Sequence, residues 1–301
     1  MSPSIRPVNG WCSNVALART VAGIAFSNPV LLASGTAGYG REVAGVTALH
    51  RLGGLVTKAV SRDARGGNRP PRVAEFTGGM LNSVGLANPG ASAVRQHDLP
   101  WLAAAAPSLP VIINVVGFTV AEYAEVIAVL DDFPGHVAYE LNLSCPNTSA
   151  GGAEFGADPA SVTAVVAQCR LATARPIFAK LSPALPNIVA IASVAVAAGA
   201  DGITAVNTMP GTDFDGAEPR IGQGYGGVSG PALRPVGLLA VSRIAAALPG
   251  IPVIGVGGIS TAGHVRDYLR AGAALVAIGT AALADPHLAT RIITELERDD
   301  G

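Results

Sequence analysis

A cysteine follows an apolar, strand-like segment in the stretch "YELNLSCPNTSAGG", which covers residues 139–152. A thiol in such a place can act as a general base once neighbouring cations lower its pKa. A lone cysteine is more often a small buried apolar residue. Cys145, however, stands directly after a strand at the start of a Gly-rich loop, and it is therefore our candidate proton acceptor. Cys169 lies within a helical pattern and is predicted to belong to the core, and Cys12 has no evident role.

Histidine offers no competing base in this interpretation. All five histidines are predicted to lie on helices or in the turns next to them, away from the ends of the strands. They are His50, His97, His136, His264 and His287.

Lysine is rare in this chain, and its placement is informative. Of the 20 basic residues only two are lysines, and the other 18 are arginines. Lys58 and Lys180 both end predicted strands, in "GLVTKA" and "PIFAKL". Ordinary surface lysines are the alternative explanation. A compact ammonium at a strand end is better suited to a substrate carboxylate or to the ring of a bound flavin.

Two glycine-containing turns indicate a phosphate site. "IGVGGIS" and "AIGTAAL" place Gly257, Gly258, Gly279 and Thr280 after two consecutive strands, each followed by a helical pattern. Glycine also serves tight turns in general. Two such turns at adjacent strand ends favour an anion held by backbone N–H groups. The phosphate could belong to a substrate or to FMN.

Amide side chains gather in the same predicted region. They can offer donors and acceptors to a flat, uncharged, imide-like ring, which suits a pyrimidine better than a sugar phosphate. Surface turns also use asparagine, so only the group as a whole carries this interpretation. The group consists of Asn82, Asn114, Asn142, Asn147 and Asn207.

The elements that must position these residues alternate between apolar strands and Ala-rich helices. This alternation predicts a single (β/α)8 barrel domain over residues 1–301, with chemistry at the carboxyl ends of its strands. Two long connections, 61–86 and 208–231, are expected to be active-face loops after the second and sixth strands. Helices are expected to begin in "DPASV" and "STAGH". The predicted strands cover residues 29–34, 54–59, 111–117, 137–143, 176–181, 202–207, 252–257 and 275–280.

Composition narrows the class of protein and the kind of partner further. The chain has 301 residues, 50% hydrophobic content and a net charge of -1, which argues against nucleic acid or an anionic membrane as its partner. The N-terminus lacks the apolar core of a signal peptide, and the longest apolar run is too short to span a membrane. Three cysteines without CxxC spacing predict a reduced, cytoplasmic protein without a metal site or iron-sulfur ligands of its own.

The motifs together resemble a known enzyme family. "PVLLASGTAGYG", "TKAV", "MLNSVGLANPG", "NLSCPN", "AKLSP", "VNT", "GGVSGPALRP", "GVGGI" and "AIGTAAL" stand in order between about residues 15 and 285. They resemble class 1 dihydroorotate dehydrogenases, and most of all the class 1B catalytic subunit. The resemblance covers nearly the whole chain.

The resemblance implies a chemistry and a set of residues. Cys145 would remove the C5 proton of dihydroorotate while hydride leaves C6 for flavin N5, giving orotate in pyrimidine biosynthesis. FMN would contact Ser34, Lys58, Ala59, Asn114, Asn142, Lys180, Val206 and Gly230, with its phosphate at Gly257, Gly258, Gly279 and Thr280. Dihydroorotate would contact Lys58, Asn82, Ser83, Val84, Gly85, Leu86, Asn142, Asn147, Asn207 and Thr208.

The resemblance also implies partners. A catalytic homodimer would join a second subunit that carries FAD and a [2Fe–2S] cluster, giving a heterotetramer that passes electrons to NAD+. Alternatives are a class 1A enzyme that uses fumarate and a flavin oxidoreductase similar to dihydropyrimidine dehydrogenase. A phosphate-binding barrel without redox activity is the alternative from a different class.

Overall fold

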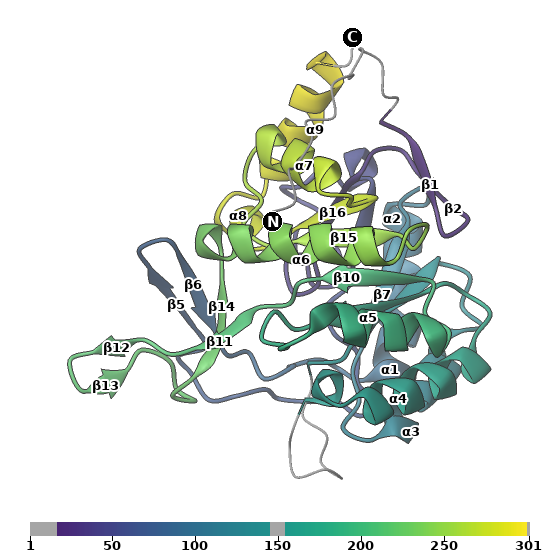
Figure 1. Ribbon diagram of the computed structural model, residues 1–301, viewed down its shortest axis with the longest axis horizontal. Coiled ribbons are helices and arrows are strands. Elements are labelled where there is room, and N and C mark those ends of the chain that lie inside the picture. Colours follow the sequence, from purple (N-terminus) through teal and green to yellow (C-terminus); the bar gives the residue numbers. More distant parts are fainter. Residues whose placement is uncertain (1–16, 145–153, 300–301) are drawn as a thin grey trace, which may run out of the picture.

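The computed structural model describes residues 17–144 and 154–299 and contains a closed barrel of eight parallel strands (Figure 1). This confirms the predicted (β/α)8 fold. Each barrel strand pairs in parallel with the next, and β10 closes the circle between β9 and β15. The barrel strands are β3 (Val30–Leu32), β4 (Gly54–Val56), β7 (Val111–Val115), β8 (Ala138–Asn142), β9 (Ile177–Leu181), β10 (Gly202–Ala205), β15 (Val253–Val256) and β16 (Leu275–Ile278).

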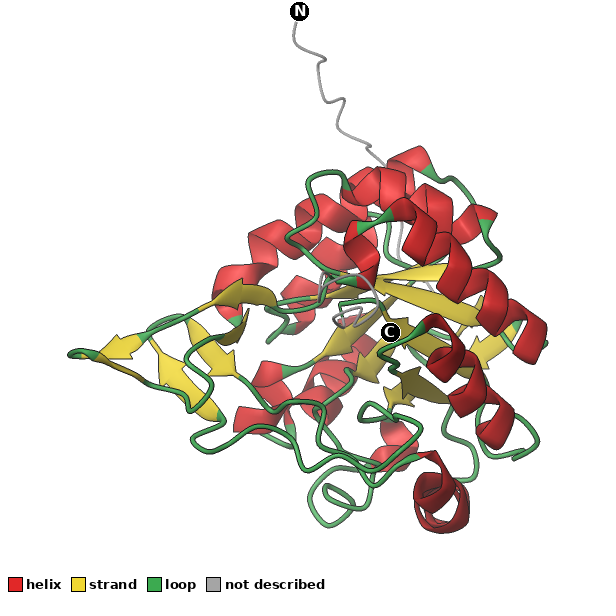
Figure 2. Cartoon of the chain, turned by 90° about the horizontal axis from the view of Figure 1, so that it is seen from below, coloured by secondary structure: helices red, strands yellow, loops and turns green. Residues whose placement is uncertain are grey.

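Helices surround the strands, as Figure 2 shows. Two predicted helix starts are found close to their expected places. The Asp158 side chain accepts hydrogen bonds from the backbone N–H groups of Ala160 and Ser161, and the Thr261 side chain accepts one from the backbone N–H of His264. The helices are α1 (Ala91–Ala93), α2 (Leu99–Ala105), α3 (Val120–Leu130), α4 (Pro159–Ala172), α5 (Ile188–Ala197), α6 (Arg234–Ala247), α7 (Ala262–Arg270), α8 (Thr280–Ala284) and α9 (Leu288–Asp299).

Side chains alternate between the barrel interior and the surrounding helices because successive residues of a strand point to opposite faces. The interior is apolar in its lower part, where Ile112, Ala138 and Phe178 form one cluster with side chains from the other strands. The hairpin of β1 (Arg19–Val21) and β2 (Ile24–Phe26) contributes to that cluster. The outward-facing side chains form a larger core with the helices, and the buried Cys169 belongs to it, as predicted.

The two long connections are not plain loops. The first contains β5 (Val73–Phe76) and β6 (Gly79–Asn82), and the second contains β11 (Met209–Gly211) and β14 (Gly226–Ser229). These four strands form one antiparallel sheet in the order β11-β14-β6-β5. The short hairpin of β12 (Phe214–Asp215) and β13 (Glu218–Pro219) extends beyond it as an arm (Figure 1). The insertions therefore support each other although they are far apart in the sequence, which the pattern of glycines and prolines did not predict.

The barrel strands are shorter than the sequence suggested. Lys58, Asn207 and Gly257 all lie just past the ends of their strands rather than within them. The polar residues thus occupy the rim of the barrel. Among the described residues, no helix is long and apolar enough to cross a membrane, and no cluster of three or more histidine, cysteine or acidic side chains could hold a metal ion.

Candidate active site at the carboxyl ends of the strands

The upper interior of the barrel holds a buried polar cluster. Asn114 and Glu140 are opposite each other in the β7–β8 register, and the Asn114 Nδ2 group donates a hydrogen bond of 2.7 Å to Glu140 Oε1. Lys180 Nζ lies 3.5 Å from the same carboxylate oxygen. The three residues are at most 6% exposed. Strands β7, β8 and β9 thus bring two predicted cofactor residues together around a carboxylate.

This cluster retains unused hydrogen-bonding capacity. Asn114 Oδ1 is buried and has no hydrogen-bond partner within the part of the chain that the structure describes. Lys180 Nζ can donate three hydrogen bonds, and Glu140 is its one partner among the described side chains. Buried polar atoms are normally paired because leaving one unpaired costs about 1–3 kcal/mol. An acceptor and a donor beside each other at the strand ends therefore favour a polar ligand.

A second set of amides continues the cluster at the rim. Asn207 Nδ2 donates to Asn142 Oδ1 at 3.1 Å, and the backbone N–H of Ser144 donates to the same oxygen at 3.3 Å. The hydroxyl group of the buried Tyr123 on α3 donates to the Asn142 carbonyl at 2.7 Å. Asn142 is thereby held in one orientation, and the backbone leading towards Cys145 is fixed up to Ser144.

The predicted phosphate residues meet at three adjacent turns. Gly258 has a φ of +63°, and a Cβ at this position would lie 2.9 Å from the Gly230 carbonyl oxygen. Thr280 Oγ1, at the start of α8, donates to Ser229 Oγ at 2.7 Å. Since Ser229 and Gly230 end or directly follow β14, these contacts bring the turns after β14, β15 and β16 together. A side chain at Gly258 would collide with the protein's own backbone, so glycine is what allows these turns to pack together.

Positive charge lies next to these turns. A Cβ on Gly258 would lie 2.6 Å from Arg234 Cβ, so α6 begins against this turn. The Arg234 guanidinium pairs with Asp267, and its Nε is buried without a hydrogen-bond partner in the described residues. His264 Nδ1 lies 3.3 Å from the backbone nitrogen of Ser260. Burial and the nearby Arg234 lower the pKa of His264, while Asp267 and the backbone of Gly258 act in the opposite direction.

The remaining predicted cofactor residues lie along the same rim. Lys58 is half-buried, its backbone N–H donates to the Gly38 carbonyl at 2.8 Å, and its ammonium makes no ion pair within residues 17–144 and 154–299. Ala59 is buried and its carbonyl accepts a hydrogen bond from Tyr39. Val206 is buried and donates its N–H to the Val256 carbonyl at 3.1 Å. Ser34 is half-buried just beyond β3, and no described contact joins it to the other predicted residues.

The predicted substrate loop is built into the antiparallel sheet. Asn82 Nδ2 donates to the Gly227 carbonyl at 3.1 Å, which joins β6 to β14. Thr208 packs against the same glycine, because a Cβ there would overlap the Thr208 side chain. Asn68 lines the loop that follows β6. Its Nδ2 contacts Ser83 Oγ at 2.8 Å, its N–H donates to the Val84 carbonyl, and it lies against Gly85. Leu86 ends the loop with a φ of +57°.

Two predicted residues, Cys145 and Asn147, lie outside the described residues, so their roles stay predictions. Two other residues were missed. Glu140 escaped notice because it lies within a strand, although an acidic residue at the centre of an apolar strand is itself a signal. His264 was placed away from the strand ends, but it contacts the turn after β15. His136 is buried just before β8, at the opposite end from the cluster.

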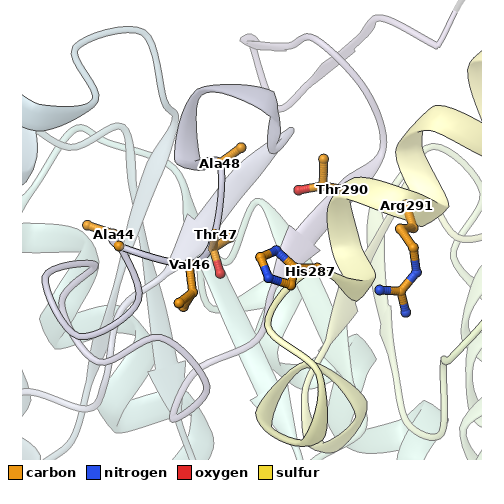
Figure 3. Close-up of a pocket in the computed structure, with 8 residues that line it drawn as sticks. Ala44, Val46, Thr47, Ala48, His287, Thr290 and Arg291 are labelled. Atoms are coloured by element: carbon orange, nitrogen blue, oxygen red, sulfur yellow. The ribbon is translucent and has the colours of Figure 1, made fainter.

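Two surface cavities lie elsewhere. One of about 530 Å³ separates the segment 44–48 from the start of α9, where His287, Thr290 and Arg291 line it (Figure 3). A second, of about 270 Å³, lies between Arg69 and the β13 arm. None of the predicted site residues lines either cavity. The first lining includes the buried Thr47 and the Thr290 hydroxyl, which has no partner among the described residues, but neither lining has a buried ion pair such as Glu140–Lys180, so we assign the chemistry to the barrel rim.

The sequence matches the dihydroorotate dehydrogenase family model over residues 16–299. This chain belongs to the dihydroorotate dehydrogenase family. It is 45% identical to a protein of Desulforudis audaxviator named dihydroorotate dehydrogenase B (NAD(+)), catalytic subunit, over 94% of this chain and 92% of that protein. A Geobacillus protein of the same name is 43% identical over 93% of this chain and 89% of its own length. A Solibacter usitatus protein, provisionally named dihydroorotate dehydrogenase A (fumarate), is 46% identical over 93% of this chain and 92% of its own length.

Proposed function

We propose that this protein is an oxidoreductase that converts (S)-dihydroorotate to orotate in pyrimidine biosynthesis. Its membership of the family and the names of its relatives support this reaction. The structural observation that carries the proposal is the buried cluster near the strand ends, in which Asn114 and Lys180 both contact Glu140 and Asn114 Oδ1 has no partner among the described residues. A buried Asn114 Oδ1 without a described partner, close to the Lys180–Glu140 pair, favours a bound polar ligand over a purely structural role for the barrel.

FMN is the cofactor that fits these residues. Its phosphate suits the turns of Gly257, Gly258 and Gly279, which follow β15 and β16 and can offer backbone N–H groups to an anion. Its imide edge presents carbonyl oxygens and an N–H group, which match the donor of Lys180 and the acceptor of Asn114. When bound, FMN would accept the hydride from C6 of dihydroorotate.

The residues of the chain itself supply the rest of the chemistry. Asn142 and Asn207 are linked by a hydrogen bond and can orient the amide groups of the substrate ring. Lys58, with no carboxylate partner among the described residues, can bind the substrate carboxylate. Cys145 follows the fixed segment that ends at Ser144. We propose that its side chain accepts the C5 proton of dihydroorotate. The stretch Asn82–Leu86 lies in the same rim and would line the substrate.

The proposal also covers the electron acceptor and the assembly of subunits. Relatives named as NAD(+) catalytic subunits support a separate electron-transfer subunit, for which we propose FAD and a [2Fe–2S] cluster. We also propose a homodimer of this chain within a heterotetramer in the cytoplasm. Fumarate is the second candidate for the electron acceptor, because the Solibacter relative is named for fumarate.

An anaerobic visible spectrum of the purified chain tests the proposal, recorded before and after L-dihydroorotate is added. A flavin spectrum that bleaches with dihydroorotate is the expected result. A flavin that stays oxidised with dihydroorotate but bleaches with dihydrouracil would move the function to another pyrimidine. A protein that binds no FMN even after reconstitution would refute the assignment. The reduced flavin is then offered each electron acceptor. Reoxidation by fumarate would indicate a class 1A enzyme, and reoxidation by NAD+ only when the second subunit is present would indicate class 1B.

A further inference from the structure

Glu140 is a buried carboxylate to which the proposed reaction gives no role. It is 1% exposed and lies in the barrel interior, on the same face of β8 as Ala138 and Asn142. Removing a carboxylate from water costs several kcal/mol unless other groups pair with it. Its partners are Asn114 and Lys180, two residues of the proposed flavin site. Its position therefore points to an effect on that site.

The first effect concerns the orientation of Asn114. An amide side chain can present either its oxygen or its nitrogen to a neighbour. Glu140 is an acceptor when ionised, and the Asn114 Nδ2 group donates to it at 2.7 Å. The amide oxygen must then face away from Glu140, where it is buried with no donor among the described residues. Glu140 thereby makes Asn114 an acceptor for the flavin imide N–H.

The second effect concerns charge. The Lys180 ammonium lies 3.5 Å from Glu140 Oε1, and both side chains are nearly inaccessible to water. A lysine alone would favour the electron-rich, reduced form of a neighbouring ring over its neutral, oxidised form. A carboxylate beside that lysine opposes this preference. The pair therefore keeps a hydrogen-bond donor in place while reducing the positive field that it exerts.

We propose that Glu140 is a positioning residue of the flavin site that fixes the Asn114 acceptor and lowers the reduction potential of bound FMN by offsetting the charge of Lys180. The inference rests on the proposed function, because it requires FMN to occupy the rim of the barrel. It concerns how the protein sets the driving force of the reaction rather than which reaction it catalyses.

Glu140→Gln is the first test, since it removes the charge and keeps the shape. Two quantities are measured on the FMN-loaded protein: the midpoint potential, by spectroelectrochemistry, and the dissociation constant of oxidised FMN, by flavin fluorescence. We expect the preference for reduced over oxidised FMN to rise about tenfold, which is about 30 mV for a two-electron couple. Oxidised FMN should bind about fivefold more weakly, because the amide that the substitution introduces can itself turn and no longer orients Asn114.

Glu295→Gln provides the matched control, because Glu295 is an exposed residue on α9. This variant should leave both quantities unchanged. A wild-type potential in Glu140→Gln would overturn the inference while leaving the proposed function intact. If the wild-type chain binds no FMN at all, both proposals are wrong. These two failures are distinguished by the spectrum of the wild-type protein.

A second comparison tests the charge of Glu140 in a background without the lysine. Lys180→Met leaves the carboxylate without its cation, whereas Lys180→Met combined with Glu140→Gln leaves no buried charge. The double variant should have a potential about 30 mV above that of the single variant, for the same charge reason and the same two-electron conversion. Equal potentials in the two variants would contradict the proposed role of Glu140.

Discussion

His136 should make the stability of the protein depend on pH between 6.5 and about 4. The ring is 2% exposed and packs against the Tyr139 ring at a centroid distance of 4.9 Å. Neither ring nitrogen makes a well-formed hydrogen bond to a described residue. Burial, assisted by the charge of Arg175, lowers the pKa of His136 to about 4, while Asp131 and the backbone of Phe133 act in the opposite direction.

The sign and size of the effect follow from these values. The folded-state pKa lies below the ordinary value of 6.5, so the unfolded chain takes up the proton first as the pH falls. The contribution of the neutral ring to the free energy of unfolding is therefore fully present above pH 6.5 and is lost progressively down to about pH 4. One proton over this window corresponds to roughly 3 kcal/mol of unfolding free energy.

Urea unfolding at a series of pH values measures this contribution. His136→Phe serves as the comparison, because it keeps a ring against Tyr139 and cannot be protonated. The wild-type protein should lose about 3 kcal/mol more than the variant between about pH 6.5 and 4. Carboxylates that titrate in this range affect both proteins equally and cancel in the comparison. Parallel pH profiles would refute the reasoning, since they would mean that the His136 ring takes up its proton at the same pH in the folded and the unfolded protein.

Three further predictions concern the proposed active site. Cys145→Ala should slow flavin reduction by dihydroorotate on the order of 10²–10⁴-fold in stopped-flow absorbance, if the thiol is the base; an unchanged rate would exclude it from that role. Gly258→Ala should weaken FMN binding at least about tenfold in a fluorescence titration, because its Cβ would meet the Gly230 carbonyl, and the turn could not hold the phosphate. Gly216→Ala, with a similar φ of +61° but no atom within 4 Å, should bind FMN normally, and equal losses in both variants would argue against a phosphate turn. Tyr123→Phe removes the hydrogen bond to the Asn142 carbonyl and should lower the free energy of unfolding by about 1 kcal/mol in urea; no loss would show that this bond does not hold the strand end.

The barrel could be predicted from the sequence because its signal is local. Each buried parallel strand is a continuous apolar run, and each run stands between helical patterns with recognisable starts, such as Asp158 before α4. The predicted phosphate turns were also local, since their glycines follow the strands directly. What the pattern could not mark was where each strand stops, because apolar residues such as Val116 and Val206 continue past some of the strand ends.

The antiparallel sheet beside the barrel could not be predicted in the same way. Its strands are short and rich in glycine, and they pair residues such as Asn82 and Gly227 that lie far apart in the chain. Pairings of this kind leave no periodic pattern in either segment. The sequence therefore indicated two polar insertions, while only the folded chain shows that they form one support for the rim.

The amino-acid sequence by itself determined which residues lie near the carboxyl ends of the strands, because each barrel strand is a local apolar run that is followed closely by a polar residue or a glycine. The tertiary structure decided how those residues interact. Asn114, Glu140 and Lys180 come from three strands, and only the barrel register places the carboxylate within 2.7 Å of the amide and 3.5 Å of the ammonium. Hydrogen bonds and charge interactions depend on distances of a few ångströms, and barrel closure sets those distances.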